Sequence, residues 1–113
     1  MPRPIYEVKA QYFKTLGHPV RIRVLEVLSG GPHSVSELLP EVGIESSHLS
    51  QHLGVLRRAG VVQAERQGSS MIYSAVDPAV FELLKVAKEI LLTRTSAAAD
   101  LRADLDTIDF EAS

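Results

Sequence analysis

The sequence contains no cysteine and no tryptophan, and only 5% of its residues are aromatic. Without thiols the chain can form no disulfide, no thiolate metal site and no cysteine nucleophile. Its apolar runs are a few residues long, far below the roughly 20 residues that cross a bilayer. The first ten residues contain no signal-peptide core. We therefore expect a cytoplasmic protein with no membrane partner.

Glycine and proline are also scarce, with 7 Gly and 6 Pro in 113 residues, which excludes a collagen-like or low-complexity chain. Hydrophobic residues make up 45% and charged residues 23%, as in ordinary globular proteins. The length predicts one domain. Catalytic patterns are missing as well: there is no glycine-rich phosphate loop, no HExxH motif and no nucleophile beside a base. We expect no enzyme activity and no cofactor.

Positive charge is in short supply overall, because the formal net charge is −2. Its distribution is uneven. Residues 1–66 carry eight Lys or Arg against six Asp or Glu, a net charge of +2, whereas residues 67–113 carry four against eight, a net charge of −4. Nucleic-acid binding is thus neither required nor excluded. We interpret residues 1–94 as the folded domain and 95–113 as an acidic extension, helical or partly disordered.

Apolar residues at helical spacing predict four helices in the first half of the chain. We expect the first from about 5 to a stop at 17, the second from 19 to a stop at 30–32, the third from 34 to a stop at 43, and the fourth from 46 or 47 to 59. Ser34 and Glu37 form a capping-box pattern at the start of the third helix. Pro40 lies inside that helix and should keep it short or bent.

Two β-prone runs, 61–66 and 71–76, flank a polar loop that contains glycine, and they predict a hairpin. Asp77-Pro78 then predicts the entry to a last helix whose apolar residues lie on more than one face. Such a helix needs burial on two sides, and in so short a chain a second subunit is the simplest source. Whether this helix breaks near 95–96 stays open.

The short third helix, the tight turn 43–45 and the polar-faced helix 46–58 are arranged like a helix-turn-helix motif. In that motif the second helix enters the major groove of DNA, and this one would be about 20 Å long. Gln can bond both edge atoms of adenine, and Ser can bond bases or phosphates. The free face of this helix offers Ser47, His48, Ser50 and Gln51.

Basic and polar residues flank that face. Arg57 and Arg58 lie at the far end of the helix, which suits phosphate contacts better than base contacts. The expected hairpin tip carries Arg66, Gln67 and Ser69, which we expect to reach the flanking backbone or minor groove.

Residues 5–92 resemble the ArsR/SmtB family of winged helix-turn-helix repressors. The matching stretches are LGHPVRIRVL at 16–25, SVSEL at 34–38 and, most specific, SQHLGVLRRAGVV at 50–62, followed by Gly68 and Tyr73-Ser74. The resemblance implies a mainly α fold with a small β-hairpin in the order α-α-α-α-β-β-α. It also implies a homodimer that represses transcription at an inverted-repeat, double-stranded operator and is released by a signal.

The resemblance assigns roles to particular residues. It places the family's DNA-contacting helix positions on Ser46, Ser47, Ser50 and Gln51, and it implies a dimer built from the first and last helices. The apolar residues that we expect in this interface are Ile5, Tyr6, Tyr12, Phe13, Phe81, Leu84, Ala87 and Leu91.

The family's metal sites do not match this sequence. Two positions that hold cysteines in one such site fall on Ser34 and Ser36, and hydroxyls are poor ligands for soft metals. A second site keeps only its Asp, as Asp77, and its other positions fall on Ala79, Ile90 and Thr93. We expect no bound metal and an unidentified small-molecule or protein effector.

Three further interpretations compete with these. The wing carries Ser69 where family members commonly have Arg, which predicts a weaker hold on DNA. His48 and His52 have the spacing of a helical metal pair, although two ligands do not complete a zinc site. The low positive charge also fits a winged-helix module that binds another protein and no DNA.

Overall fold

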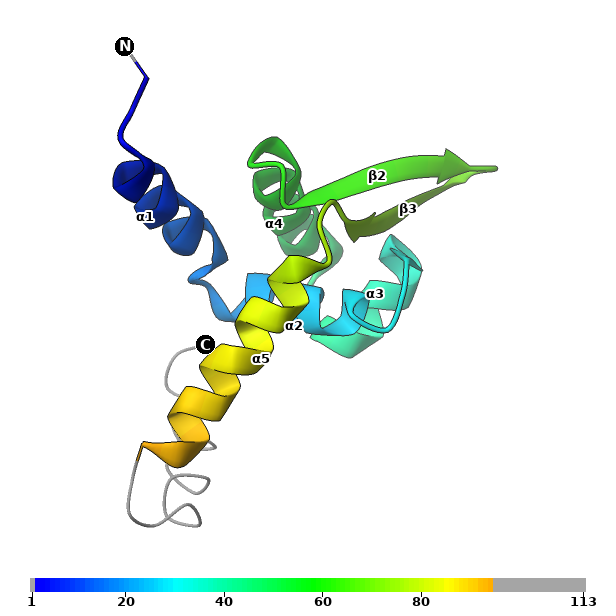
Figure 1. The fold of residues 1–113 in the computed structure, drawn as a ribbon. Coiled ribbons are helices and arrows are strands. Elements are labelled where there is room, and N and C mark those ends of the chain that lie inside the picture. Colours follow the sequence, from blue (N-terminus) through cyan, green and yellow to red (C-terminus); the bar gives the residue numbers. More distant parts are fainter. Residues whose placement is uncertain (1, 95–113) are drawn as a thin grey trace. The chain divides into compact units, whose positions relative to one another are not determined.

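The computed structural model describes residues 2–94, which fold into five helices and three short strands (Figure 1). The predicted order of four helices, a hairpin and a fifth helix is confirmed, with one added strand. In chain order the elements are α1 (Ile5–Leu16), α2 (Pro19–Leu28), β1 (His33–Ser34), α3 (Val35–Val42), α4 (Ser46–Arg58), β2 (Val62–Gln67), β3 (Ser70–Ala75) and α5 (Ala79–Thr93).

The chain divides into two compact units between Pro78 and Ala79, and each is described by itself. The expectation of one domain over 1–94 remains a prediction. The expected extension at 95–113, including the open question of a helix break at 95–96, lies outside the described residues. Among the described residues no helix is both long and apolar enough to span a membrane.

The added strand β1 has only two residues, and a segment that short shows no periodic pattern from which a strand could be predicted. It pairs antiparallel with β3, so that the sheet order is β1-β3-β2. His33 lies opposite Tyr73 and Ser34 opposite Ile72. The strand therefore ties the start of α3 to the hairpin.

Helix α3 begins and ends as its sequence predicts. The Ser34 hydroxyl accepts the Glu37 N–H at 3.2 Å, and Glu37 Oε1 accepts the Ser34 N–H at 2.8 Å, which completes the capping box. The helix continues past Pro40 but stays short, at eight residues. Gly43 ends it at a φ of 77°, a left-handed conformation that glycine adopts without strain. The chain then turns directly into α4.

The hairpin is one residue displaced from its predicted bounds. Gln67 pairs with Ser70, so the loop consists of Gly68 and Ser69 alone. Gly68 has a φ of 63° and Ser69 has no positive φ, the pattern of a type II′ turn. This tight turn extends both strands to the tip, which projects away from α4 (Figure 1).

The core of the first unit lies beneath α4. Its most deeply buried side chains come from four elements, α2, α3, α4 and β2, and are Val24, Leu25, Leu38, Leu49, Leu53, Leu56 and Val62. Because one side of α4 contributes three of these residues, the opposite side is left free.

Helix α5 forms the described part of the second unit. Val86, Ile90 and Leu91 are exposed on it. Of the residues predicted for the dimer interface, Phe81 and Leu84 are partly exposed and Ala87 is exposed. The sequence expectation omitted Val86 and Ile90, which share a helical face because they are four residues apart.

Candidate nucleic-acid interface

Helix α4 is anchored by one apolar stripe. Leu49, Leu53 and Leu56 are 0%, 1% and 0% exposed, and the helix packs against α2 and β2. These leucines follow the spacing of one helical face. Their burial fixes the rotation of α4 about its own axis and so decides which residues face outward.

The outward face carries the residues that the sequence selected for DNA contact. All five side chains near the start of α4 are exposed: Ser46, Ser47, His48, Ser50 and Gln51. Ser47 and Gln51 are four residues apart, as are Ser46 and Ser50, so they share neighbouring positions on the helix surface. The face thus presents short hydroxyls, one imidazole and one amide without a bulky apolar side chain.

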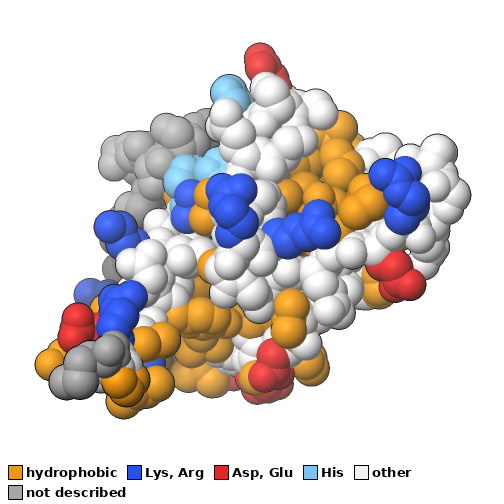
Figure 2. Space-filling model, turned by 90° about the horizontal axis from the view of Figure 1, so that it is seen from above, with side chains coloured by type: hydrophobic (Ala, Val, Ile, Leu, Met, Phe, Trp, Pro, Cys, Tyr) orange, Lys and Arg blue, Asp and Glu red, His pale blue; other side chains and the backbone are white. Residues whose placement is uncertain are grey.

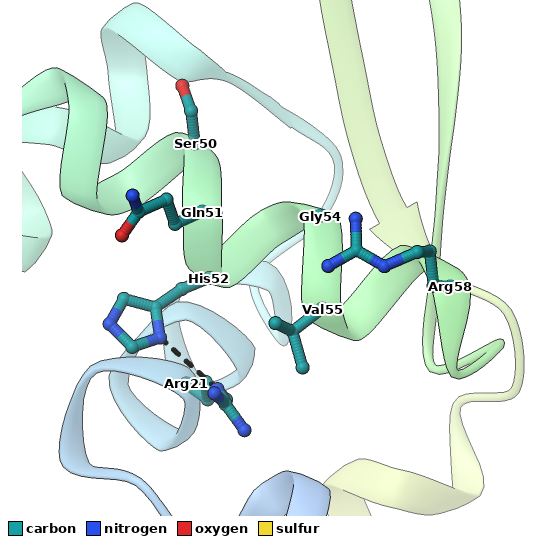
Figure 3. Close-up of a pocket in the computed structure, with 7 residues that line it drawn as sticks. All are labelled: Arg21, Ser50, Gln51, His52, Gly54, Val55 and Arg58. Atoms are coloured by element: carbon teal, nitrogen blue, oxygen red, sulfur yellow. Dashed lines mark hydrogen bonds between the residues drawn. The ribbon is translucent and has the colours of Figure 1, made fainter.

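Arg57 and Arg58 are both exposed at the far end of α4, where the sequence places them. The Arg58 side chain turns back along the helix toward Gly54 (Figure 3). A Cβ on Gly54 would lie 3.1 Å from Arg58 Nη1. The missing side chain at Gly54 therefore leaves room for the Arg58 guanidinium over the preceding turn of α4.

The hairpin tip carries the predicted wing residues. Arg66, Gln67 and Ser69 are all exposed, at the end of β2 and in the turn. Ser69 occupies the second turn position, next to Gly68. The structure thus presents these three side chains together at the tip.

A contact that no sequence pattern indicated joins α4 to α2 and α1. Arg21 on α2 donates from Nε to His52 Nδ1 at 3.1 Å and from Nη1 to the Thr15 carbonyl at 3.0 Å. The His18 and His52 rings lie 4.3 Å apart between centroids, and His18 Nδ1 accepts the Val20 N–H at the start of α2. Arg21 and His52 are 31 positions apart in the sequence, so no local sequence pattern predicts the hydrogen bond between them.

The protonation of His52 is biased by these neighbours. Burial lowers the pKa of His52, and its electrostatic interactions with His18, Arg21 and His48 lower it further. A neutral ring keeps Nδ1 as an acceptor for Arg21. The contact therefore depends on the uncharged form of His52.

A hollow of about 400 Å³ lies beside the exposed face of α4. The seven residues that line it come from α2 and α4 (Figure 3) and are Arg21, Ser50, Gln51, His52, Gly54, Val55 and Arg58. None of these seven is acidic. Seen from the side of α4 and the hairpin, Lys and Arg side chains spread across the surface while Asp and Glu lie toward its edge (Figure 2).

Helix α1 exposes the aromatic and aliphatic side chains predicted for dimerisation. Ile5, Tyr6 and Phe13 are 68%, 70% and 54% exposed, and Tyr12 is partly buried. The Tyr12 and Phe13 rings meet edge to face with centroids 6.4 Å apart. Val8 is also exposed on this helix, although the predicted set omitted it.

Metal ligands do not cluster in residues 2–94: no group of three or more His, Asp or Glu is placed to hold an ion there. His48 is exposed, whereas His52 Nδ1 is occupied by Arg21. The Ser34 hydroxyl caps α3 and lies 3.1 Å from the Ser36 hydroxyl.

A helix followed by a tight turn, a second helix with a free polar face, and a two-stranded wing define a winged helix-turn-helix domain. A family described as a helix-turn-helix domain matches residues 16–63. The HTH-type transcriptional regulator Rv0081 of Mycobacterium tuberculosis is 55% identical over 105 residues, which cover 88% of this chain and 92% of that protein. The chain belongs to the ArsR/SmtB family of winged helix-turn-helix transcriptional regulators.

Solved structures agree with this assignment. The crystal structure of Rv0081 has a TM-score of 0.72 at 58% identity, covering 80% of this chain and 91% of that one. The transcriptional repressor BigR from Xylella fastidiosa has a TM-score of 0.67 at 35% identity, covering 80% of this chain and 96% of that one.

Proposed function

We propose that the chain is a homodimeric transcriptional repressor that binds an inverted-repeat operator through α4 and the hairpin. The observation that carries this proposal is the two-sided construction of α4. Its apolar stripe is fully buried, and the exposed face carries serines, His48, Gln51 and two arginines. A helix built in this way is rigidly held and free to enter the major groove.

Each exposed group has a role in this proposal. Gln51 reads a base edge, and Ser46, Ser47, His48 and Ser50 bond bases or phosphates. The arginines at the end of α4, Arg57 and Arg58, fix the register on the backbone, and the hairpin tip with Arg66, Gln67 and Ser69 contacts the flanking DNA.

Dimerisation is supported by the exposed apolar side chains of α1 and, separately, of α5. Large apolar side chains exposed together on one helix mark an interaction surface. We propose that Ile5, Tyr6, Tyr12 and Phe13 of α1, with Phe81, Leu84, Ala87 and Leu91 of α5, form the seam. Two copies would present their α4 helices to half-sites about 34 Å apart, one turn of DNA.

Repression is supported by the names of relatives rather than by geometry. BigR is named a transcriptional repressor, and a Streptomyces lividans protein 32% identical over 100 residues is named a probable mercury resistance operon repressor. In this chain we expect an effector other than a metal, because Ser34 and Ser36 offer hydroxyls, which are poor ligands for soft metals, and the Ser34 hydroxyl already caps α3. The protein acts in the cytoplasm and catalyses no reaction.

Fluorescence anisotropy with duplexes from the chain's own promoter tests this function. We expect binding that weakens steeply with added salt, because phosphate contacts release counterions. The variant Ser50→Ala/Gln51→Ala should lose binding and remain dimeric, whereas Gln11→Ala, an exposed change on α1, should bind normally. If no duplex binds in a salt-sensitive way, the repressor proposal fails and the protein-binding module is favoured.

A further inference from the structure

The hollow between α2 and α4 is chemically suited to an anion. Two arginines, Arg21 and Arg58, line it together with the uncharged Ser50 and Gln51. No carboxylate lines the hollow to neutralise these charges. A planar guanidinium matches the paired oxygens of a phosphoryl group better than any other protein cation.

We propose that this hollow is a phosphoryl-binding site, and that it takes one backbone phosphate of the operator when α4 lies in the major groove. The inference rests on the proposed DNA binding and adds a particular site to it. It assigns a DNA contact to Arg21, which the sequence did not mark, and it moves Arg58 from the far end of α4 to its flank.

The position of the hollow supports a backbone phosphate. A helix with its side chains is about 10–12 Å across, and the major groove is about 12 Å wide. A helix in that groove is therefore bordered by phosphates on both flanks. Ser50, Gln51, Gly54 and Arg58 belong to α4 itself, and Arg21 reaches the hollow from α2. The hollow thus lies on the flank where one strand's backbone would pass.

Arg21 is held in place before DNA arrives. Arg21 uses Nε and Nη1 to bond His52 and Thr15, which fixes its guanidinium against α4 and α1. Arg58 lies over Gly54, where a side chain would crowd its Nη1. Groups ordered in advance lose less conformational entropy on binding.

Single neutral phosphates in the operator test the site. Each phosphate of one half-site is replaced in turn by a methylphosphonate, and anisotropy gives the affinity of the wild type, Arg58→Gln and Arg57→Gln. We expect one position at which the neutral group weakens wild-type and Arg57→Gln binding by roughly 5- to 30-fold, a charge-assisted contact of about 1–2 kcal/mol. Arg58→Gln should bind the duplex with that methylphosphonate as well as it binds the unmodified duplex, because the contact is already lost.

Arg57→Gln is the matched comparator, because it removes the same charge from the neighbouring exposed position. The hollow is not the site if every methylphosphonate weakens the binding of Arg58→Gln as much as that of the wild type. It is also not the site if one methylphosphonate weakens the wild type but neither variant. Wild-type protein that binds no duplex would instead refute the repressor function itself. Thermal melts of both variants check that each is folded.

Inorganic phosphate distinguishes the two sources of a phosphoryl group. At equal ionic strength we expect it to displace DNA no better than chloride, because the operator phosphate is held by the rest of the interface. Stronger displacement that disappears in Arg58→Gln would assign the same hollow to a free phosphoryl compound. Stronger displacement that persists in Arg58→Gln would place the anion elsewhere and overturn the proposal.

Discussion

Replacing Phe13 by alanine should weaken dimerisation without unfolding the protomer. Phe13 is 54% exposed on α1 and its ring meets that of Tyr12 on the same helix, so truncation costs some local packing, and a thermal melt checks that the protomer stays folded. Alanine also favours the helix more than phenylalanine does. A loss of dimer would therefore report on the surface of α1 and not on its folding.

The size of the effect follows from the exposed area. A phenylalanine side chain offers roughly 200 Å², of which about 100 Å² is free here, worth about 2.5 kcal/mol at ~25 cal/mol per Å². In a two-fold symmetric interface the change occurs twice, so about 5 kcal/mol is the upper value. Burial in an interface is rarely complete, and we expect about 2–5 kcal/mol, a dimer Kd raised from about 30-fold to several thousand-fold.

Sedimentation equilibrium of the wild type and of Phe13→Ala measures this change directly. Lys14→Ala is the matched control, because it truncates an adjacent exposed residue of the same helix. A wild type that is monomeric at micromolar concentration refutes the dimer, and an unchanged Kd in Phe13→Ala removes the α1 surface from it.

Three further predictions concern α4 and its supports. Gly54→Ala replaces a mid-helix glycine, so it should raise stability by roughly 0.5–1 kcal/mol in denaturant titrations and weaken operator binding by crowding Arg58; a tighter complex would contradict this. Ser34→Ala removes the cap of α3 and should cost about 1 kcal/mol in the same titrations, while Ser36→Ala should cost less. The pKa of His52 is lower in the folded chain than its ordinary value of about 6.5. Just below pH 6.5 the unfolded chain therefore binds more protons at this residue than the folded chain does. The free energy of unfolding should therefore fall as pH drops below about 6.5, and this fall should be smaller in His52→Gln than in the wild type.

The helices could be predicted from the sequence because their signals are local. The capping box of Ser34 and Glu37, the stop at Gly43 and the leucine stripe of α4 each depend on residues within a few positions of one another. The buried stripe also determined the exposed face, so the polar candidates on α4 were placed correctly on its surface. Whether these residues touch DNA remains a prediction.

The parts that the sequence did not predict depend on distant residues. Strand β1 exists only because β3 lies beside it, and two residues carry no period. The Arg21–His52 bond and the hollow arise where α2 and α4 meet, a juxtaposition that no spacing encodes. The direction of Arg58 also depends on space left by a glycine on the preceding turn.

The net charge of −2 is a weak guide to this interface, because charge acts over short distances. At physiological salt a charge is screened within about 8 Å, so DNA responds to the side chains that face it. Helix α4 contains no Asp or Glu between Ser46 and Arg58, whereas most acidic residues fall after position 66. On the proposed function, the basic residues that face DNA supply salt-sensitive phosphate contacts, and these carry no sequence information. Selectivity then comes from the groups that α4 presents, and the rigidity supplied by the buried leucines keeps those groups in register.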